Sequence, residues 1–335
     1  MISSFYEKIL GTSSIAESNQ QKILCVGLTC LDIVQACKQY PVEDSDQRSV
    51  EYRWQRGENI GCPTSTVILS LSSGSRTILH HNPNLPELTL KNFEQLHLGN
   101  YSWIHFEGRN LSEVLSMMQC VENYNSMLHH SQDTDSKGMD ISQVPITISV
   151  ELERPKQELL DLLPYVDVAF ISKEFAQSRG YDNMSETLKN ISEDAKSGAT
   201  LICAWADRGA MARTPDNITV QSPAFSPQKI VDTLGAGDTF NAAVLHFLNR
   251  AKLEFIKSKK LEENETNSTL KKNVELKRNI KKNYNIESLE CSHAEFITQN
   301  VLQAAVTFGC QVAGAKVGLT GYNKLGEIFK NALES

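Results

Sequence analysis

Short apolar runs separated by segments of helical periodicity constrain the fold of this chain more than any other feature. The runs are Lys22–Leu28, Trp103–Phe106, Ile146–Val150, Val166–Ile171 and Leu201–Ala204. Helical patterns follow at Asn110–Asn125, Lys156–Leu163, Glu174–Arg179, Ser185–Ser197 and Thr298–Lys316. Strands that are apolar on both faces and joined by helices form parallel sheets covered on both sides. The sequence therefore predicts an α/β fold with a central, mostly parallel sheet flanked by helices.

Other segments alternate apolar and polar residues, as strands with one exposed face do. These are Arg48–Gln55, Thr66–Leu71 and Arg76–His80. We expect a small lid sheet with strands within about 37–56 and 64–80. One domain over 21–335 would carry both sheets, after an N-terminal extension at 1–20.

Charge and polarity mark an insertion near the C-terminal end of the domain. Residues 252–290 hold ten basic and seven acidic residues, so they are predicted to form a solvated, partly helical insertion. His129–Val144 is predicted to be a second surface loop. The net charge of the chain is −7, which argues against a nucleic-acid partner.

The cysteines and the N-terminus bear on the cellular compartment. Eight cysteines lie at 25, 30, 37, 62, 120, 203, 291 and 310 without a Cys-x-x-Cys pair, which favours buried thiols over disulfides or a zinc site. No apolar run is long enough to cross a membrane, and Met1–Gln20 lacks the apolar core of a secretory signal. We expect a cytoplasmic protein without a membrane partner.

The string Asp232-Thr-Leu-Gly-Ala-Gly-Asp-Thr-Phe240 carries the main functional signal. The preceding Lys229–Asp232 reads as a strand end, and apolar residues from Phe240 onward have helical spacing. Small residues at a helix start let backbone N–H groups approach an anion. A carboxylate there, Asp238, is placed to take a proton. The plainer alternative is a tight connection in which Asp238 caps the helix.

This string resembles the C-terminal motif of the ribokinase-like (pfkB) carbohydrate kinases. Further strings, among them Arg53–Gly57, Glu107–Asn110 and Phe308–Gly314, resemble the ketohexokinases of that family. The resemblance covers roughly residues 22–250 and 295–325. It implies a ribokinase-like fold with a lid, and transfer of the γ-phosphoryl group of ATP to the C1 hydroxyl of fructose. Mg²⁺ would accompany the nucleotide, K⁺ is left open, and the lid strands would pair two copies into a homodimer.

The resemblance also implies roles for individual residues. Asp238 would be the base, the amides of Gly235, Ala236 and Gly237 an anion hole, and Arg76 a cation from the lid. Asp32, Gly57 and Asn59 would bind the sugar, with a local cap as an equal alternative for Asp32. Trp205, Ala206, Asp207, Gly209 and Cys310 would line the nucleotide together with Gly235 and Gly237, with simple core packing as the alternative for Trp205 and Cys310. No metal ligands are assigned, because Ile171–Glu174 does not spell the family's Asn-x-x-Glu motif; Glu151 or Glu153 would contribute through water.

Two departures qualify the expected activity. The family's Gly-Gly-Asn is Gly57-Glu58-Asn59 here, which adds a charge beside the sugar. After Asn59 the chain passes within a few residues to Pro63 and a strand that resembles a lid strand reached only several dozen residues later in the ketohexokinases. The resemblance therefore implies that a block is missing, which in the family holds the rest of the asparagine-rich sugar motif, the helix it opens, and a strand and helix of the central sheet. Its loss would expose apolar faces and leave strand edges unpaired. We therefore expect an impaired fructokinase. An inactive nucleotide-binding or dimerising isoform and a kinase of another sugar or nucleoside are the alternatives, and nucleic-acid binding through 252–290 is the weakest.

Overall fold

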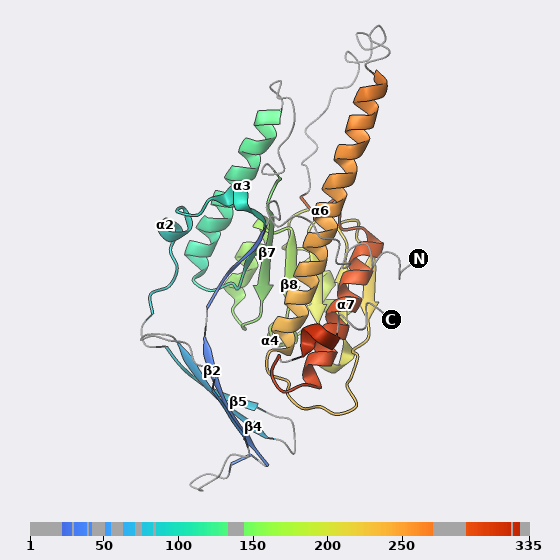
Figure 1. The fold of residues 1–335 in the computed structure, drawn as a ribbon. Helices are drawn as coiled ribbons and strands as arrows, with labels where there is room; N and C mark the ends of the chain where they lie inside the picture. Colours follow the sequence, from blue (N-terminus) through green and yellow to red (C-terminus); the bar gives the residue numbers. More distant parts are fainter. Residues whose placement is uncertain are drawn as a thin grey trace.

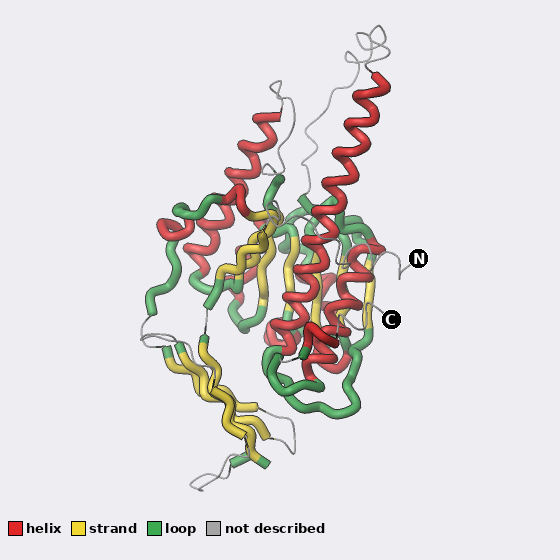
Figure 2. The backbone as a smooth tube through the Cα atoms, viewed as in Figure 1, coloured by secondary structure: helices red, strands yellow, loops and turns green. Residues whose placement is uncertain are grey.

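The chain folds into a large sheet with helices on both faces and a smaller sheet beside it (Figure 1). The computed structural model describes residues 22–28, 30–38, 40–41, 51–54, 63–70, 76–82, 85–132, 144–270, 293–322 and 324–328. Residues 1–20, including the predicted N-terminal extension, lie outside them. In Figure 2 the strands of the smaller sheet form a layer of their own at the side of the main body.

The large sheet has seven strands in the order β1-β6-β7-β8-β9-β10-β11. Their bounds are β1 (Lys22–Val26), β6 (Tyr101–Phe106), β7 (Thr147–Leu152), β8 (Val168–Ile171), β9 (Thr200–Ala204), β10 (Ala210–Arg213) and β11 (Thr219–Ser222). β1 and β6 to β9 pair in parallel, whereas β10 and β11 are antiparallel. The predicted mostly parallel sheet is confirmed. The carboxyl ends of its five parallel strands share one edge, where α/β folds bind ligands.

Two hydrophobic cores cover the two faces of this sheet. In β8, Ala169 and Ile171 face one core, while Val168 and Phe170 face the other, as the period of two along a strand requires. The first core is closed by α2 (Leu90–Phe93), α3 (Leu111–Gln132), the 3-10 helix η4 (Gln157–Tyr165), α4 (Lys173–Ser178) and α5 (Met184–Ile191). The second is closed by α6 (Ala236–Leu270) and α7 (Gln299–Val317). Two short 3-10 helices are η2 (Leu98–Asn100) and η5 (Ala206–Arg208).

The smaller sheet, called the lid sheet below, has four strands in the order β3-β2-β4-β5. They are β2 (Leu31–Cys37), β3 (Glu51–Trp54), β4 (Thr64–Ser70) and β5 (Arg76–His81). The lid is confirmed, but its predicted limits were wrong because β2 begins at Leu31 and not near 37. Val34, Val67 and Leu69 form its buried centre, and Leu234 packs against them. The lid sheet thus touches the segment that enters α6.

The predicted insertion at 252–290 was wrong at its start, since α6 continues as one helix to Leu270. The long helix runs beyond the end of the sheet in Figure 1. Lys252 is 4% exposed, and its Nζ donates to Ser102 O at 2.8 Å, Pro145 O at 2.5 Å and Thr147 Oγ1 at 2.8 Å. The charged run around Lys252 predicted a solvated side chain. Instead, Lys252 binds oxygens at the amino ends of β6 and β7. Residues 271–290 lie outside the described residues.

Two other local predictions were wrong for related reasons. Lys229–Asp232 is not a strand, because its backbone reaches no neighbouring strand; the N–H groups of Val231 and Asp232 donate to Val317 O at the end of α7. The polar stretch 129–144 is not all loop either. α3 continues to Gln132, and Val144 is buried before β7. Residues 133–143 lie outside the described residues.

β1 lies at the edge of the large sheet, and among the described strands it pairs with β6 alone. Lys22 and Cys25 are exposed and the rest of β1 is half-buried, whereas five of the six residues of β6 are buried. An open edge at β1 is what the loss of a neighbouring strand would produce. The missing block itself stays a prediction.

Six cysteines fall within the described residues, and all six are free thiols. Cys37, Cys203 and Cys310 are buried as predicted, Cys30 and Cys120 are half-buried, and Cys25 on the open edge is exposed. Cys62 and Cys291 lie outside this part of the chain. None of the helices in the described part is both long and apolar enough to span a membrane.

The buried side-chain nitrogen of Lys252 yields a test of this packing. Replacing Lys252 with Met leaves three oxygen acceptors without their donor, so we expect the free energy of unfolding to fall by about 1–3 kcal/mol. The matched control is Lys257→Met, because Lys257 is an exposed lysine of the same helix whose Nζ contacts Glu254 at the surface. Urea denaturation of both variants measures the difference.

The same pair of variants carries a pH test. Burial lowers the pKa of Lys252 to about 7, whereas a lysine of the unfolded chain titrates near ~10.4. Between these values the unfolded state binds the extra proton, so the stability contributed by Lys252 rises with pH. The gap between wild type and Lys252→Met should widen from pH 7 to pH 9. A gap that narrows over this range would contradict the assignment.

Candidate active site

The carboxyl edge of the parallel strands is lined by acidic and glycine residues. Gly27 follows β1, and a Cβ at Gly27 would lie 2.6 Å from Glu107 Oε2, so only glycine lets the two strand ends approach this closely. The Glu107 carboxylate accepts the Leu28 N–H at 2.6 Å and Arg109 Nη2 at 2.8 Å. Burial alone would raise the pKa of Glu107, but these hydrogen bonds and the charge of Arg109 lower it. The charged Glu107 side chain therefore links the residues that follow β1 to those that follow β6.

The glycine turn, defined here as residues 233–237, leads into α6. Gly235 has φ +71°, and a Cβ at this position would overlap Tyr322 Oη. Its carbonyl accepts the Thr239 N–H at 2.9 Å and Thr239 Oγ1 at 2.7 Å, which closes the first helical turn. Gly237 is exposed, and the Ala236 N–H makes a long 3.3 Å bond to Thr233 O. The first turn of α6, at the positive end of the helix dipole, is thus exposed at Gly237.

Asp238 lies in the first turn of α6 and is exposed. Its Oδ2 is 3.7 Å from the point where a Cβ of Gly235 would be. The carboxylate acts electrostatically on two neighbours. Partial desolvation, followed by repulsion from Glu151 and Asp238, raises the pKa of Glu153. Partial desolvation and the charge of Asp238 likewise raise the pKa of Tyr322.

Glu151 and Glu153 stand at the end of β7, close to Asp238. Asn241 on α6 donates to Glu151 Oε1 at 2.6 Å, and His105 Nε2 lies 3.9 Å from Glu151 Oε2. No three His, Cys, Asp or Glu side chains of the described residues are grouped closely enough to hold a metal ion by themselves. Mg²⁺ commonly keeps several waters and uses one or two carboxylates with substrate phosphates. Glu151 and Glu153 fit such a water-mediated shell, and the repulsion that raises the pKa of Glu153 would be relieved by a cation.

A buried ion pair between Asp232 and Lys316 holds the residues that enter the glycine turn. Asp232 Oδ1 accepts the Leu234 N–H at 3.0 Å, and Oδ2 accepts the Gly321 N–H at 3.1 Å. Lys316, in the last turn of α7, places its Nζ 3.2 Å from Asp232 Oδ2. Burial alone would raise the pKa of Asp232, whereas Lys316 and the two backbone donors lower it. The turn is therefore tied to the end of α7.

The structure places the predicted sugar residues only in part. Asp32 is an exposed residue of β2, in register with Ser65 of β4, so the alternative that it caps a helix or turn was wrong. Asp32 and Val34 share one face of β2, and Leu234 of the glycine turn packs against the cluster that contains Val34, so Asp32 lies on the side of the lid sheet that faces the turn. Arg76 is the first residue of β5 and pairs with Leu69 of β4, at the opposite end of β4 from Ser65, the partner of Asp32. Gly57 and Asn59 lie outside the described residues.

The predicted nucleotide residues cluster where β9 turns into β10. Trp205 is 2% exposed and packs in the first core, and its backbone N–H donates to Gly209 O at 2.7 Å. Ala206 and Asp207 are exposed in η5, and Ala206 has φ +47°. Gly209 has φ +81°, and a Cβ there would overlap Ser222 O.

Cys310 of α7 belongs to the second core, on the other face of the sheet from Trp205. Burial raises the pKa of its thiol, which interacts with Ser222 and the backbone of Ala210. Both Trp205 and Cys310 are packed core residues, as the simpler alternative held. Their nucleotide role stays a prediction.

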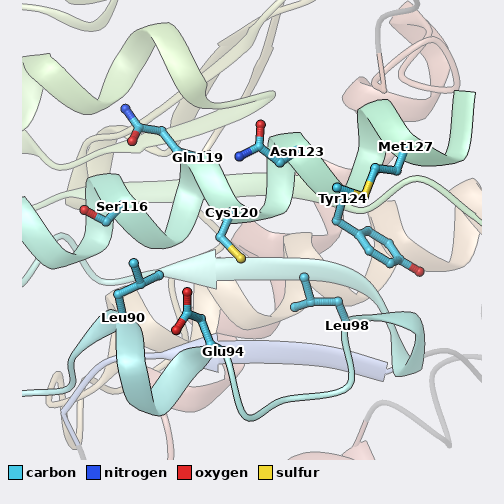
Figure 3. Close-up of a pocket in the computed structure, with 9 residues that line it drawn as sticks. All are labelled: Leu90, Glu94, Leu98, Ser116, Gln119, Cys120, Asn123, Tyr124 and Met127. Atoms are coloured by element: carbon cyan, nitrogen blue, oxygen red, sulfur yellow. The ribbon is translucent and has the colours of Figure 1, made fainter. Parts of the chain in front are cut away.

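A pocket of about 490 Å³ lies elsewhere, between α3 and the segment that holds α2 and η2 (Figure 3). Leu90, Glu94 and Leu98 face side chains of α3 across it, among them Cys120 and Tyr124. Of the predicted site residues that the structure describes, none lines this pocket. The geometry therefore favours the carboxyl edge, and not the pocket, as the functional site.

Sequence reasoning missed four residues that shape this edge. Lys316, Tyr322 and Asn241 reach the site by tertiary contacts and carry no local signal. Glu107 was quoted only as part of a resemblance, although its position directly after an apolar run, followed by Gly108, was a usable signal of a strand end. Gly108 has φ +74°, as a sharp turn after a strand requires.

Comparisons with known proteins agree with this geometry. The family model described as pfkB family carbohydrate kinase matches residues 46–263. Ketohexokinase of Mus musculus is 33% identical over 353 residues, covering 91% of this chain and 98% of that protein.

Solved structures show the same fold at low sequence identity. A ribokinase from Giardia lamblia aligns with a TM-score of 0.66 at 12% identity, over 94% of this chain and 99% of its own. A probable sugar kinase from Rhizobium etli CFN 42 aligns with a TM-score of 0.59 at 16% identity, over 94% and 99%. The fold is ribokinase-like, and the chain belongs to the pfkB family of carbohydrate kinases.

Proposed function

We propose that this carbohydrate kinase transfers the γ-phosphoryl group of ATP to the C1 hydroxyl of fructose. The observation that carries the proposal is the position of Asp238, exposed in the first turn of α6 directly after the glycine turn. A helix start is an anion site, and a carboxylate beside it can take a proton from the attacking hydroxyl. The similarity to ketohexokinase supports fructose as the acceptor.

The residues at the carboxyl edge of the large sheet would each have a separate role in phosphoryl transfer. Asp238 would accept the proton of the sugar hydroxyl, while the N–H groups of Gly235, Ala236 and Gly237 stabilise charge on the transferred phosphoryl group. Ala236 would exchange its long bond to Thr233 O for a phosphate oxygen. Glu151 and Glu153 would hold the waters of Mg²⁺, which relieves charge on the phosphates. Arg76 would supply a cation from the lid sheet, and Asp32, Gly57 and Asn59 would bind the sugar.

The nucleotide would lie along the turn between β9 and β10. Ala206 and Asp207 are exposed there, and Gly209 keeps the turn tight. Trp205 would support this turn from the core. Cys310, through Ser222, would support the neighbouring strand end.

We propose further that the activity is impaired. The alignment with mouse ketohexokinase spans 353 residues, more than the 335 of this chain, so the relative has positions without a counterpart here. The open edge at β1 fits the same interpretation. A silent nucleotide-binding isoform is the limiting case, and another sugar or a nucleoside is the alternative substrate.

We also propose that the protein is cytoplasmic and forms a homodimer through the lid sheet. Ile78 and Leu79 of β5 are 47% and 59% exposed, an apolar edge that a second copy would cover. Sedimentation of the purified protein distinguishes one copy from two.

Replacing Asp238 with Asn tests the proposed chemistry. We expect formation of fructose 1-phosphate to fall about 10²–10⁴-fold, with ATP affinity kept, because the amide cannot take the proton. Asp216→Asn, at an exposed turn, is the control. Coupled assays with fructose, ribose and adenosine measure both variants. Product from ribose or adenosine but not fructose would refute the fructose assignment, and wild-type turnover of about 1–100 s⁻¹ would refute the impairment.

Two glycine substitutions test the geometry of the turn. Gly235→Ala forces a Cβ against Tyr322 Oη at φ +71°, so we expect it to lower the melting temperature by several degrees, equivalent to about 1 kcal/mol or more. Gly237→Ala meets no atom within 4 Å and should leave the melting temperature unchanged. Equal melting temperatures for the two variants would show that the turn has another conformation in solution.

A further inference from the structure

A lysine is buried behind the glycine turn, on the side away from solvent. Lys316 is 1% exposed, and its Nζ donates to Asp232 O at 3.0 Å and lies 3.2 Å from Asp232 Oδ2. It also stands 5.5 Å from the centre of the Tyr322 ring. Burying an ammonium is costly, so its retention here calls for a role.

The partner of this lysine carries a negative charge next to the proposed anion hole. Asp232 Oδ1 accepts the N–H of Leu234, the residue directly before Gly235. The pKa of Asp232 is lowered despite its burial, so the carboxylate is charged at neutral pH. Without a neighbouring cation, a carboxylate this close to Gly235 would repel a phosphoryl group bound at the start of α6.

Asp232, the partner of Lys316, also connects the turn to the segment after α7. Asp232 Oδ2 accepts the Gly321 N–H, and the next residue, Tyr322, places its Oη against Gly235 and interacts with the Thr239 side chain. The ion pair therefore holds the residue that precedes the glycine turn, and the phenol contacts Gly235 within it. Lys316 acts on this turn through Asp232.

We propose that Lys316 is a positioning residue of the phosphoryl-transfer site, which cancels the charge of Asp232 and so keeps the glycine turn attractive to the phosphates of ATP. The proposal rests on the proposed kinase function. It assigns the lysine an electrostatic role in ATP binding beyond its contribution to folding. The effect should appear as a higher Kd and KM for ATP, more than as a loss of kcat.

A set of variants separates charge from structure. Lys316→Met leaves the buried carboxylate unopposed, and we expect ATP affinity, measured by calorimetry with ATP and Mg²⁺, to fall about tenfold or more. Lys316→Arg keeps the charge and should recover most of the affinity. The double variant Asp232→Asn with Lys316→Met removes both charges and should also recover it, although it restores no ion pair.

The matched control is Lys189→Met, because Lys189 is an exposed lysine in the last turn of α5. ATP affinity of Lys316→Met equal to that of Lys189→Met would overturn the proposal. So would a folded double variant that binds ATP as weakly as Lys316→Met, since the role would then be structural. Should Lys316→Met not fold, Asp232→Asn alone decides: unchanged or tighter ATP binding supports the proposal, and weaker binding overturns it.

Failure of the proposed function looks different. Wild-type protein that binds ATP but forms no sugar phosphate contradicts the kinase assignment, while the affinities of the variants still test Lys316. Product formation with unchanged affinity in Lys316→Met contradicts the inference alone. Wild-type protein that binds no ATP overturns both.

Discussion

The ion pair between Asp232 and Lys316 fixes the one segment on which the site depends. It joins the end of α7 to the residues that enter α6, so the glycine turn is placed at the carboxyl edge of the sheet. Both partners are almost fully buried, and removing either one alone leaves an uncompensated charge. Because Asp232 also bonds the Leu234 N–H, the same contact sets the conformation of the turn and the field at the helix start.

The site is assembled from elements that are distant in sequence. β6 and β7 supply Glu107 and Glu151, α6 supplies Asp238 and Asn241, and the lid sheet supplies Asp32. Leu234 packs against the buried centre of the lid, so lid and turn are mechanically linked. A sugar held by the lid would therefore act on the same segment that holds the phosphates. If a block is missing after Asn59, as the resemblance predicts, we expect turnover to suffer through this linkage more than nucleotide binding.

The sequence predicted those features that local pattern controls. Apolar runs located the five parallel strands, and the glycine string located the start of α6 within a few residues. Features set by long-range contact were missed. Lys252 stands in a charged run, yet it is buried because oxygens of Ser102, Pro145 and Thr147 converge on it. Lys316 looks like the polar end of an apolar helix, and its partner is 84 residues away. β2 was missed because Leu31–Cys37 alternates only weakly.

The central claim is that the start of α6 binds the transferred phosphoryl group beside Asp238. A crystal structure with ADP, Mg²⁺, aluminium fluoride and fructose tests it most directly, because the fluoride complex mimics the phosphoryl group in transfer. We expect the fluoroaluminate within hydrogen-bond distance of the amides of residues 235–237, with Asp238 facing the sugar hydroxyl. Nucleotide bound away from α6, for example in the pocket between α2 and α3, would contradict it.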